Sequence, residues 1–271
     1  MDDLEGRVAV VTGGGGGLGL AIAEAFGGEG MTVVLADVRP ALVTEAVDTL
    51  GAAGIECVGA TVDVRDAAAV EELASGVVAR FGRVDVICNN AGISVPGRQW
   101  ELTLDDWDAV IGVCLWGVVN GVRSFVPRIL EGGRGGHVVN VASMSGLLTS
   151  PGIGPYTAAK HGVVGLSKGL RAELANRGVG VSVVCPGMVR TSIAEHMREY
   201  AESVGASDKQ LASIDRTAEG LAAVAIPPSE AAALVLEAVQ GDHFWVLPNG
   251  ADHLASVAAD FDELRATPTQ S

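Results

Sequence analysis

The sequence alternates short apolar runs with longer segments of helical pattern, and this alternation constrains the fold more than any other feature. Seven runs have the apolar, β-branched composition of buried strands: Val8–Thr12, Thr32–Ala36, Ile55–Thr61, Val84–Cys88, His137–Ala142, Val179–Cys185 and His243–Leu247. Six segments between them fit helices: Leu18–Glu29, Pro40–Ala53, Ala67–Phe81, a long helix capped by Thr103 and running to Leu130, Pro155–Arg177 and Pro228–Val239. Strands connected by helices pair in parallel, and strands that are apolar on both faces are covered on both sides. The sequence therefore predicts an α/β fold with a mostly parallel, seven-stranded sheet and helices on both faces.

No internal repeat and no linker interrupts this pattern, so we expect a single domain over residues 1–271. The pattern loosens after Pro186. Residues 190–225 are polar and mixed, which predicts a lid over the substrate, and residues 249–271 are expected to form a C-terminal tail.

The formal net charge is −15 at pH 7, and no cluster of Lys or Arg offsets it locally. A phosphate backbone or an anionic membrane would repel such a surface, so we expect no nucleic acid and no membrane as partners. The longest apolar run, Ala109–Val122, is too short to span a bilayer and is expected to be a buried helix. The first residues lack the basic and apolar regions of a signal peptide, which favours a cytoplasmic location.

The chain has four cysteines, and none of them forms a Cys-x-x-Cys pair. Three of them, Cys57, Cys88 and Cys185, lie in apolar runs, so buried reduced thiols are expected rather than disulfides or zinc ligands. The five histidines lack a His-x-x-x-His spacing, so no metal site is expected.

A run of glycines follows the first expected strand and leads directly into the first expected helix. Glycines at this point let the backbone turn sharply and approach a pyrophosphate, and the helix N-terminus adds amide donors. The run fits two registers of a dinucleotide-binding turn, Gly14-x-Gly16-x-x-Gly19 and Gly13-x-x-x-Gly17-x-Gly19. Its position between strand and helix favours a dinucleotide site over a merely flexible turn.

An acidic residue, Asp37, ends the second expected strand about 20 residues beyond this turn, where a carboxylate accepts hydrogen bonds from an adenosine ribose. Its charge would repel a 2′-phosphate, which favours NAD over NADP. Arg39 lies two residues further on and can soften the repulsion, so NADP stays as the alternative cofactor. A helix-capping role is the alternative for the carboxylate itself.

Tyr156 and Lys160 are four residues apart in an expected helix and therefore share one face of it. A free phenol has a pKa near 10, and lowering it by about 3 units requires about 4 kcal/mol of phenolate stabilisation. An ammonium at about 4 Å in a partly screened site supplies energy of that order, so the pair can act as a general base. Ser143 ends the fifth expected strand, where a hydroxyl can donate to the substrate oxygen.

The order and spacing of these pieces resemble the short-chain dehydrogenase/reductase family over about Arg7–Thr191, and more loosely as far as Leu247. The matching segments are Thr12-Gly13-x-x-x-Gly17-x-Gly19, Asp63-Val64, Asn89-Asn90-Ala91-Gly92, Ser143, Tyr156-x-x-x-Lys160 and Pro186-Gly187. The resemblance implies a Rossmann-type, doubly wound fold and an NAD-dependent enzyme that interconverts a secondary alcohol and a ketone. It also implies a homo-oligomer, a tetramer or a dimer, in which helices at Thr103–Leu130 and Pro155–Arg177 pair between subunits.

The resemblance also assigns roles to individual residues. The implied cofactor-binding positions are Gly13, Gly17, Leu18, Gly19, Asp37, Asp63, Val64, Asn89, Ala91, Tyr156, Lys160, Pro186, Gly187, Val189 and Thr191. Among these, Asp63 and Val64 would contact the adenine, whereas Val189 and Thr191 would hold the carboxamide. Lys160 would bind the nicotinamide ribose as well as tune Tyr156.

One position departs from the family's pattern. Members usually carry asparagine in a Val-Asn-Leu-x-Gly segment of the long helix, where it helps to hold a water that relays protons to the lysine. Here the segment reads Val113-Cys114-Leu115-Trp116-Gly117, and a thiol cannot reproduce the two donors and the carbonyl acceptor of an amide. We therefore expect chemistry that is retained but slower, with Asn120 a doubtful substitute on another face of the helix.

Two rival functions remain at this point. Gly165-Leu166-Ser167-Lys168-Gly169 matches the hydrolase pattern Gly-x-Ser-x-Gly, but it falls in the middle of an expected helix, where the serine would not be exposed. The alternative that Cys114 makes conceivable is a non-catalytic or impaired dinucleotide-binding regulatory protein on the same fold, against which intact Ser143, Tyr156 and Lys160 argue.

The substrate pocket is expected to be lined from the loops that follow strands four, five and six. The candidate lining residues are Val95, Trp100, Ser145, Leu147, Ile153 and Met188. Most of them are apolar, which predicts a hydrophobic alcohol or ketone as the small-molecule substrate. The same residues also fit an ordinary core or an interface.

Overall fold

The computed structural model describes residues 1, 3–191, 193–203, 211–212, 214–215, 224–249 and 254–266. Its seven strands form one sheet in the order β3-β2-β1-β4-β5-β6-β7, and every neighbouring pair is parallel. The strands are β1 Val8–Thr12, β2 Thr32–Asp37, β3 Cys57–Thr61, β4 Val86–Asn89, β5 Gly136–Val141, β6 Val179–Val184 and β7 Trp245–Val246. The doubly wound, Rossmann-type sheet is confirmed.

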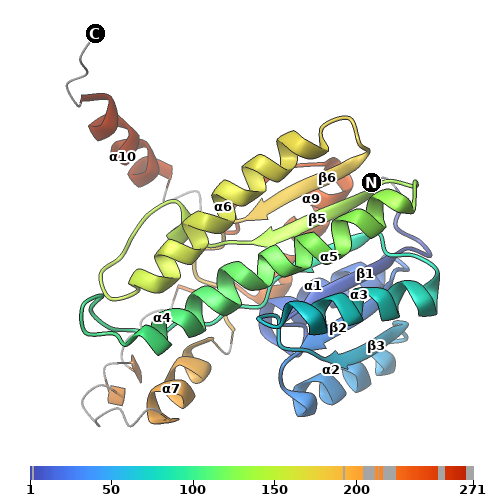
Figure 1. Cartoon of the computed structure of the whole chain (residues 1–271), viewed down its shortest axis with the longest axis horizontal. Coiled ribbons are helices and arrows are strands. Elements are labelled where there is room, and N and C mark those ends of the chain that lie inside the picture. The colour runs from blue at the N-terminus through green and yellow to red at the C-terminus, as the bar shows by residue number, and fades with distance from the viewer. Residues whose placement is uncertain are drawn as a thin grey trace.

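Helices cover both faces of this sheet (Figure 1). They are α1 Gly17–Gly28, α2 Pro40–Ala52, α3 Ala67–Phe81, α4 Leu104–Ile111, α5 Gly117–Glu131, α6 Gly154–Leu174, α7 Ile193–Ser203, α9 Pro228–Gly241 and α10 Leu254–Ala266. One buried cluster joins the sheet to α3, α5 and α6, which lie in front of it in Figure 1, and a second joins it to α1, α2 and α9. The two clusters explain why the strands are apolar on both faces.

Most predicted elements exist, with ends that differ by a few residues. β3 begins at Cys57 rather than Ile55, and β4 spans Val86–Asn89 rather than Val84–Cys88. The seventh strand is only Trp245–Val246, because its one partner is β6 and the pairing covers just these two residues. Strand ends depend on pairing with neighbours, which an apolar run does not specify.

The long helix predicted from Thr103 to Leu130 is present as Leu104–Glu131, but it contains a π-helical segment that the sequence did not predict. Thr103 caps α4 as expected, since its Oγ1 accepts a bond from the Asp106 N–H (3.2 Å) while the Asp106 carboxylate accepts one from the Thr103 N–H (2.8 Å). A π-helical segment, Gly112–Trp116, then separates α4 from α5. Gly117 follows it, and a Cβ there would lie 2.7 Å from Val64 Cγ2, so the helix passes very close to the loop after β3.

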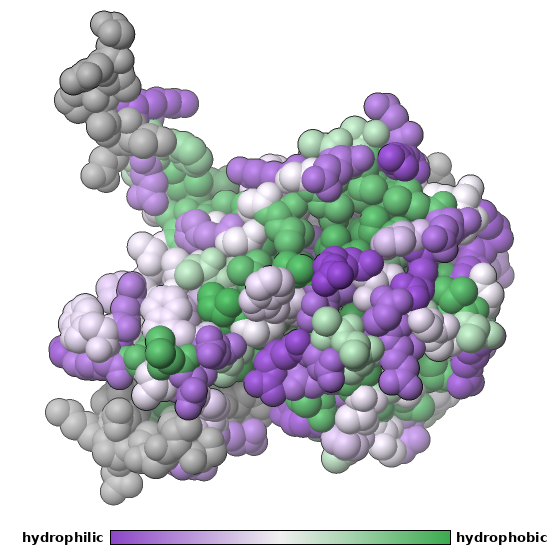
Figure 2. Space-filling model, in the orientation of Figure 1, coloured by the Kyte–Doolittle hydropathy of each residue, from purple (hydrophilic) through white to green (hydrophobic). Residues whose placement is uncertain are grey.

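Leu104–Glu131 is, within the described part of the chain, one helix that is long and apolar enough to cross a membrane, and half of its most apolar stretch is buried. The core helix of a soluble protein can be equally long and apolar. The sequence predicted a buried helix here, and about half of its most apolar stretch is buried. The other part faces outward: Trp116 is 56 % exposed. Figure 2 shows apolar surface in the area of α5 and α6 on the face in view.

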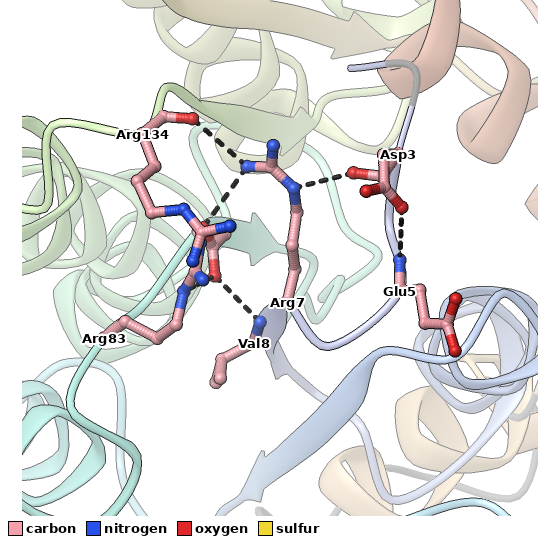
Figure 3. A network of polar contacts seen from close by, with 7 residues as sticks. Asp3, Glu5, Arg7, Val8, Arg83 and Arg134 are labelled. Atoms are coloured by element: carbon pink, nitrogen blue, oxygen red, sulfur yellow. Dashed lines mark hydrogen bonds and ion pairs between the residues drawn. The ribbon is translucent and has the colours of Figure 1, made fainter.

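The amino end of the sheet holds a buried ionic network (Figure 3). Asp85, which immediately precedes β4, is 2 % exposed and forms an ion pair with Arg83. Its carboxylate also accepts bonds from Arg7 Nη1 (3.3 Å) and from the Val8 N–H at the start of β1 (2.9 Å). The same Arg7 group donates to the Arg134 carbonyl (3.3 Å) ahead of β5, so the network joins the starts of three adjacent strands.

The expected lid and tail are described in part. Helix α7 lies within the lid range 190–225, of which residues 192, 204–210, 213 and 216–223 fall outside the described residues. Helix α10 lies within the tail range 249–271 and projects from the body of the molecule in Figure 1.

Candidate functional site

The candidate site lies at the carboxyl ends of the parallel strands. β1 and β4 are neighbours in the middle of the sheet, and the chain leaves them toward opposite faces. In open α/β sheets, ligands bind in the crevice at such a switch point. The glycine turn follows β1 at this position, and Ser143 follows β5.

The backbone of the glycine turn favours one of the two registers. Gly13 and Gly17 adopt φ values of +63° and +54°, which disfavour any other residue. A Cβ at Gly19 would lie 2.2 Å from the Gly13 carbonyl oxygen, whereas a Cβ at Gly16 would meet nothing within 4 Å. The structure therefore requires glycine in the Gly13-x-x-x-Gly17-x-Gly19 pattern and not at the centre of the alternative one.

Asn90 and Thr12, two residues of the matching segments to which no role of their own was assigned from the sequence, support this turn. Asn90 Nδ2 donates to the carbonyls of Thr12 (2.9 Å) and Gly13 (3.2 Å). Thr12 Oγ1 in turn accepts the backbone N–H groups of Asn90 (3.0 Å) and Ala91 (3.2 Å). The turn after β1 is thereby held against the segment after β4. The signal for Asn90 was its place in the Asn89-Asn90-Ala91-Gly92 motif.

Asp37 ends β2 beside the same turn and is 7 % exposed. Its Oδ2 accepts the Gly15 N–H (3.2 Å), and its Oδ1 accepts the Arg39 N–H (3.1 Å). The Arg39 guanidinium lies 3.6 Å from the same Oδ1. The carboxylate therefore positions the glycine turn.

Asp63 and Val64 lie in the loop after β3, next to the long helix. Arg65 forms a hydrogen-bonded ion pair with Asp63 (2.6 Å), which lowers the pKa of that carboxyl group. Asn120 Nδ2 donates to the Val64 carbonyl (2.9 Å). The Asn120 amide thus holds this loop.

Asn89 is buried within the sheet. Its Nδ2 donates to Asn140 Oδ1 on β5 (2.9 Å), and Asn140 Nδ2 donates to Ser167 Oγ on α6 (3.0 Å). Ser167 is fully buried, and its hydroxyl donates to the Val163 carbonyl (2.7 Å). Asn89 therefore supports the central strands, and Ser167 lacks the exposure that a hydrolase nucleophile needs.

The three expected catalytic side chains come from two elements. Tyr156 and Lys160 occupy consecutive turns of α6, and Lys160 Nζ lies 5.5 Å from the centre of the Tyr156 ring. Lys160 is 2 % exposed, and its ammonium donates to the Val141 carbonyl at the end of β5 (2.7 Å). Ser143 Oγ accepts the Ser145 N–H (3.1 Å), which fixes the serine at the start of a 3₁₀ turn.

The pKa of the Tyr156 phenol departs from the value expected from the sequence. Burial raises the pKa, and Cys114 adds to the rise, while Lys160 and a hydrogen bond with Ser143 act in the opposite direction. Burial prevails, so the pKa is raised rather than lowered by about 3 units. The sequence argument included the neighbouring charge but not the cost of removing a phenolate from water.

Cys114 is fully buried in the π-helical segment. Its Sγ donates to the Ile93 carbonyl (3.2 Å) and accepts the Ile93 N–H (3.4 Å). A Cβ at Gly92 would lie 3.6 Å from Lys160 Nζ and 3.7 Å from Cys114 Sγ, so the thiol and the ammonium border the same glycine. The thiol thus provides one donor and one acceptor contact, although not both donors of an amide.

The loop after β6 meets the glycine turn. Thr191 packs against Gly17, where a Cβ would lie 3.1 Å from Thr191 Cβ. The Pro186 carbonyl accepts the Met144 N–H (2.8 Å) near Ser143. Asn249, which the sequence analysis missed, accepts the Gly187 N–H (3.1 Å) and donates to the Met188 carbonyl (2.8 Å).

The expected pocket residues do not all come together. Val95 is buried in an apolar cluster beside Tyr156, whereas Trp100 is 80 % exposed and lies against Arg98 (5.9 Å). We call this cluster the Tyr156 cluster; it consists of Val95, Val110, Cys114 and Ala159, with Ile93, Leu102, Ile111, Leu115, Tyr156 and Tyr200 packed against it. Leu147 instead packs with the core of the sheet.

The cysteines carry free thiols, three of them buried and Cys57 partly so. In the described ranges, no three His, Cys, Asp or Glu residues are arranged to hold a metal ion.

Comparison with known proteins agrees with this geometry. Residues 7–202 match the family model described as short chain dehydrogenase. The Cα-dehydrogenase of Sphingobium sp. strain SYK-6 is 35 % identical over 92 % of this chain and 82 % of its own length. The 1-deoxy-11β-hydroxypentalenate dehydrogenase of Streptomyces avermitilis is 34 % identical over 96 % and 91 %.

Solved structures give the same assignment. A short-chain dehydrogenase/reductase from Burkholderia phymatum in complex with NAD has a TM-score of 0.91 and 38 % identity, covering 100 % of this chain and 99 % of that one. Levodione reductase has a TM-score of 0.81 and 29 % identity, covering 93 % and 99 %. On the family match, the relatives and the shared fold, the chain belongs to the short-chain dehydrogenase/reductase family of oxidoreductases.

Proposed function

We propose that this protein interconverts a hydrophobic secondary alcohol and the corresponding ketone with NAD, and that Tyr156 is its general acid/base. The observation that carries the proposal is the meeting of three groups at the carboxyl end of the sheet. Tyr156 and Lys160 share one face of α6, and Ser143 lies at the end of the adjacent strand β5. This meeting point lies beside a turn whose backbone requires glycine.

The residues at this turn fit a dinucleotide. Three glycines leave room for the backbone to approach a pyrophosphate, and α1 begins at Gly17 with its amide groups directed to that side. When bound, the nicotinamide supplies the hydride acceptor for the alcohol or the hydride donor for the ketone. Asp37 disfavours a 2′-phosphate, so NAD is proposed over NADP.

In the oxidation direction, the Tyr156 oxygen takes the alcohol proton, and in reduction it returns that proton. Lys160 stabilises the phenolate form, because its ammonium is held near the ring by the Val141 carbonyl. Ser143 donates a hydrogen bond to the substrate oxygen as the charge on that oxygen changes. Cys114 holds the Gly92–Ile93 segment against Lys160.

The apolar Tyr156 cluster supports a hydrophobic substrate. The name of the pentalenate relative also indicates a hydroxyl-bearing substrate, which agrees with alcohol oxidation. We further propose a dimer or tetramer that buries the outward face of α5 and α6, because Trp116 and the apolar surface there are exposed in the single chain.

The experiment that tests this function follows NADH absorbance with a panel of secondary alcohols, for wild type and Tyr156→Phe. We expect wild-type turnover, and a fall in kcat of about 10²- to 10⁴-fold in the variant, since the proton-transfer group is lost. The variant should still bind NADH through the glycine turn, and its thermal unfolding should be unchanged. Binding of NADH without turnover of any alcohol or ketone would support a non-catalytic regulatory protein, and intact turnover in Tyr156→Phe would refute the role of this phenol.

A further inference from the structure

The second tyrosine of the chain links the lid helix to the start of the long helix. Tyr200 lies on α7, and its hydroxyl donates to Asp106 Oδ1 on α4 at 2.6 Å. This bond spans 94 residues of sequence. Figure 1 shows α7 below α4, at the same end of the molecule.

Asp106 is a pre-positioned acceptor for this hydroxyl. It is 8 % exposed, and its other oxygen, Oδ2, accepts both the Thr103 N–H (2.8 Å) and the Thr103 hydroxyl (2.7 Å). Because the helix cap holds one oxygen, the other is directed to Tyr200 without further ordering of the side chain.

The charge state of this contact is constant around neutral pH. Burial alone would raise the pKa of Asp106, but hydrogen bonds from Tyr200 and Thr103 outweigh it and lower that pKa. Burial and the neighbouring carboxylate raise the pKa of Tyr200 to about 12. A charge-assisted bond of this kind is stronger than one between neutral groups.

Tyr200, like Tyr156, packs against the cluster of buried residues described above. These residues, Val95, Val110, Cys114 and Ala159, form the centre of the Tyr156 cluster. A side chain of the lid and the proposed acid/base therefore border one apolar surface. The next residue of α7, Ala201, is 8 % exposed, so the helix is packed against the body of the protein on a neighbouring face as well.

From these contacts, and resting on the proposed function, we infer that Tyr200 is the specificity-determining residue of the substrate site. Asp106 holds the ring at a fixed position above the Tyr156 cluster. The ring thereby limits the size of the apolar group that fits beside Tyr156. The substrate class is a secondary alcohol or ketone whose apolar part is small enough to lie under the ring.

Two variants test the roles of the Tyr200 hydroxyl and of its ring separately: Tyr200→Phe removes only the hydroxyl, and Tyr200→Ala removes both. Tyr200→Phe keeps the ring but removes the bond to Asp106, so α7 should open more often. We expect amide hydrogen exchange of residues 193–203 to become about tenfold faster, as the loss of a hydrogen bond to a charged group predicts. Asp108→Asn, an exposed change on the same helix α4, is the matched control and should leave this exchange unchanged.

Kinetics then test specificity with a smaller and a larger probe, 1-phenylethanol and 1-(2-naphthyl)ethanol. Tyr200→Phe should raise KM for both about five- to tenfold, with kcat changed less than twofold. Tyr200→Ala should shift the ratio of kcat/KM about tenfold toward the naphthyl substrate, because the limiting ring is gone. NADH affinity should not change in either variant.

The outcomes distinguish this inference from the proposed function. Unchanged exchange of α7 in Tyr200→Phe overturns the role of the Asp106 bond. Faster exchange with an unchanged substrate ratio in Tyr200→Ala overturns the specificity role. If no alcohol or ketone is turned over by wild type, the proposed function fails and the specificity role fails with it, while the exchange experiment still decides whether Asp106 holds the lid.

Discussion

Each end of the parallel sheet holds a buried charged side chain, but only the one at the amino end has partners of opposite charge. At the amino end, Asp85 is 2 % exposed and is surrounded by Arg7, Arg83 and a backbone N–H. At the carboxyl end, Lys160 is equally buried, and among the described residues its ammonium has a neutral carbonyl and an aromatic ring as neighbours, with no carboxylate in an ion pair.

This difference indicates that the two charged residues have different roles. Removing one partner of a buried ion pair destabilises the fold strongly, whereas a buried charge without a counter-ion is itself destabilising. Asp85 therefore belongs to the part of the sheet that holds the strands together. Lys160 is kept, in the proposed mechanism, for its effect on Tyr156 and in spite of its desolvation.

The sharpest test at the carboxyl end is Lys160→Met, which removes the charge and keeps the apolar stem. We expect kcat/KM to fall about 10³-fold, in the range of lost acid–base assistance. The free energy of unfolding should stay constant or rise by about 1 kcal/mol, because an unpaired buried charge is removed. Parallel kinetics and urea denaturation measure both. A large loss of stability would show that Lys160 is a structural residue.

The matching test at the amino end is Asp85→Asn, which leaves Arg7 and Arg83 without their carboxylate. The free energy of unfolding should fall by about 3 kcal/mol or more, as for other broken buried ion pairs, while the activity of the folded fraction stays the same. Glu101→Gln is the control, since its pair with Arg98 is 56–69 % exposed and should contribute less than about 1 kcal/mol. If the two variants lowered the free energy of unfolding equally, the buried network around Asp85 would contribute no more than an exposed pair, and the proposed difference between the two ends would be wrong.

A smaller effect concerns His137, near the start of β5 and 1 % exposed. Burial lowers its pKa to about 3, so the folded protein binds a proton there less readily than the unfolded chain does. The neutral ring stabilises the fold fully above pH 6.5, and this contribution decreases as the pH falls toward 3. Wild type should therefore lose about 2 kcal/mol from this group between pH 7 and pH 5.

The variant His137→Gln lacks this titration, so its stability should depend less steeply on pH over the same interval. Denaturant midpoints at a series of pH values provide the measurement. Asp242 lies close by, since a Cβ at Gly180 would be 2.3 Å from Asp242 Oδ1 and 2.4 Å from His137 Nδ1. If wild type and variant show the same slope, that carboxylate compensates the protonated ring.

The features that could be predicted from the sequence are those that depend on consecutive residues. Buried strands, helix caps such as Thr103 and the glycine turn each leave a signal in consecutive residues, and the structure contains all three. The π-helical segment around Cys114 left no such signal, and the Cys114 thiol bonds to Ile93, which lies outside the helix and is distant in sequence.

The sequence predicted which side chains lie together at the candidate site, but not the pKa of Tyr156. Tyr156 and Lys160 were found from their spacing, yet the direction of the Tyr156 pKa depends on how deeply the fold buries the phenol. Asn249 and Tyr200 were missed for a related reason. Each acts through a partner about 60 or more positions away, and a single sequence carries no trace of such pairs.

Asp37 has two roles, and this limits how the coenzyme preference of the enzyme can be changed. One oxygen of the carboxylate holds the Gly15 N–H, so the residue that would discriminate against a 2′-phosphate also shapes the loop that would receive the pyrophosphate. Exchanging Asp37 for a neutral or basic side chain to admit NADP would remove both properties together. A successful change of coenzyme would need a replacement acceptor for Gly15, introduced in the same step as the new phosphate-binding group.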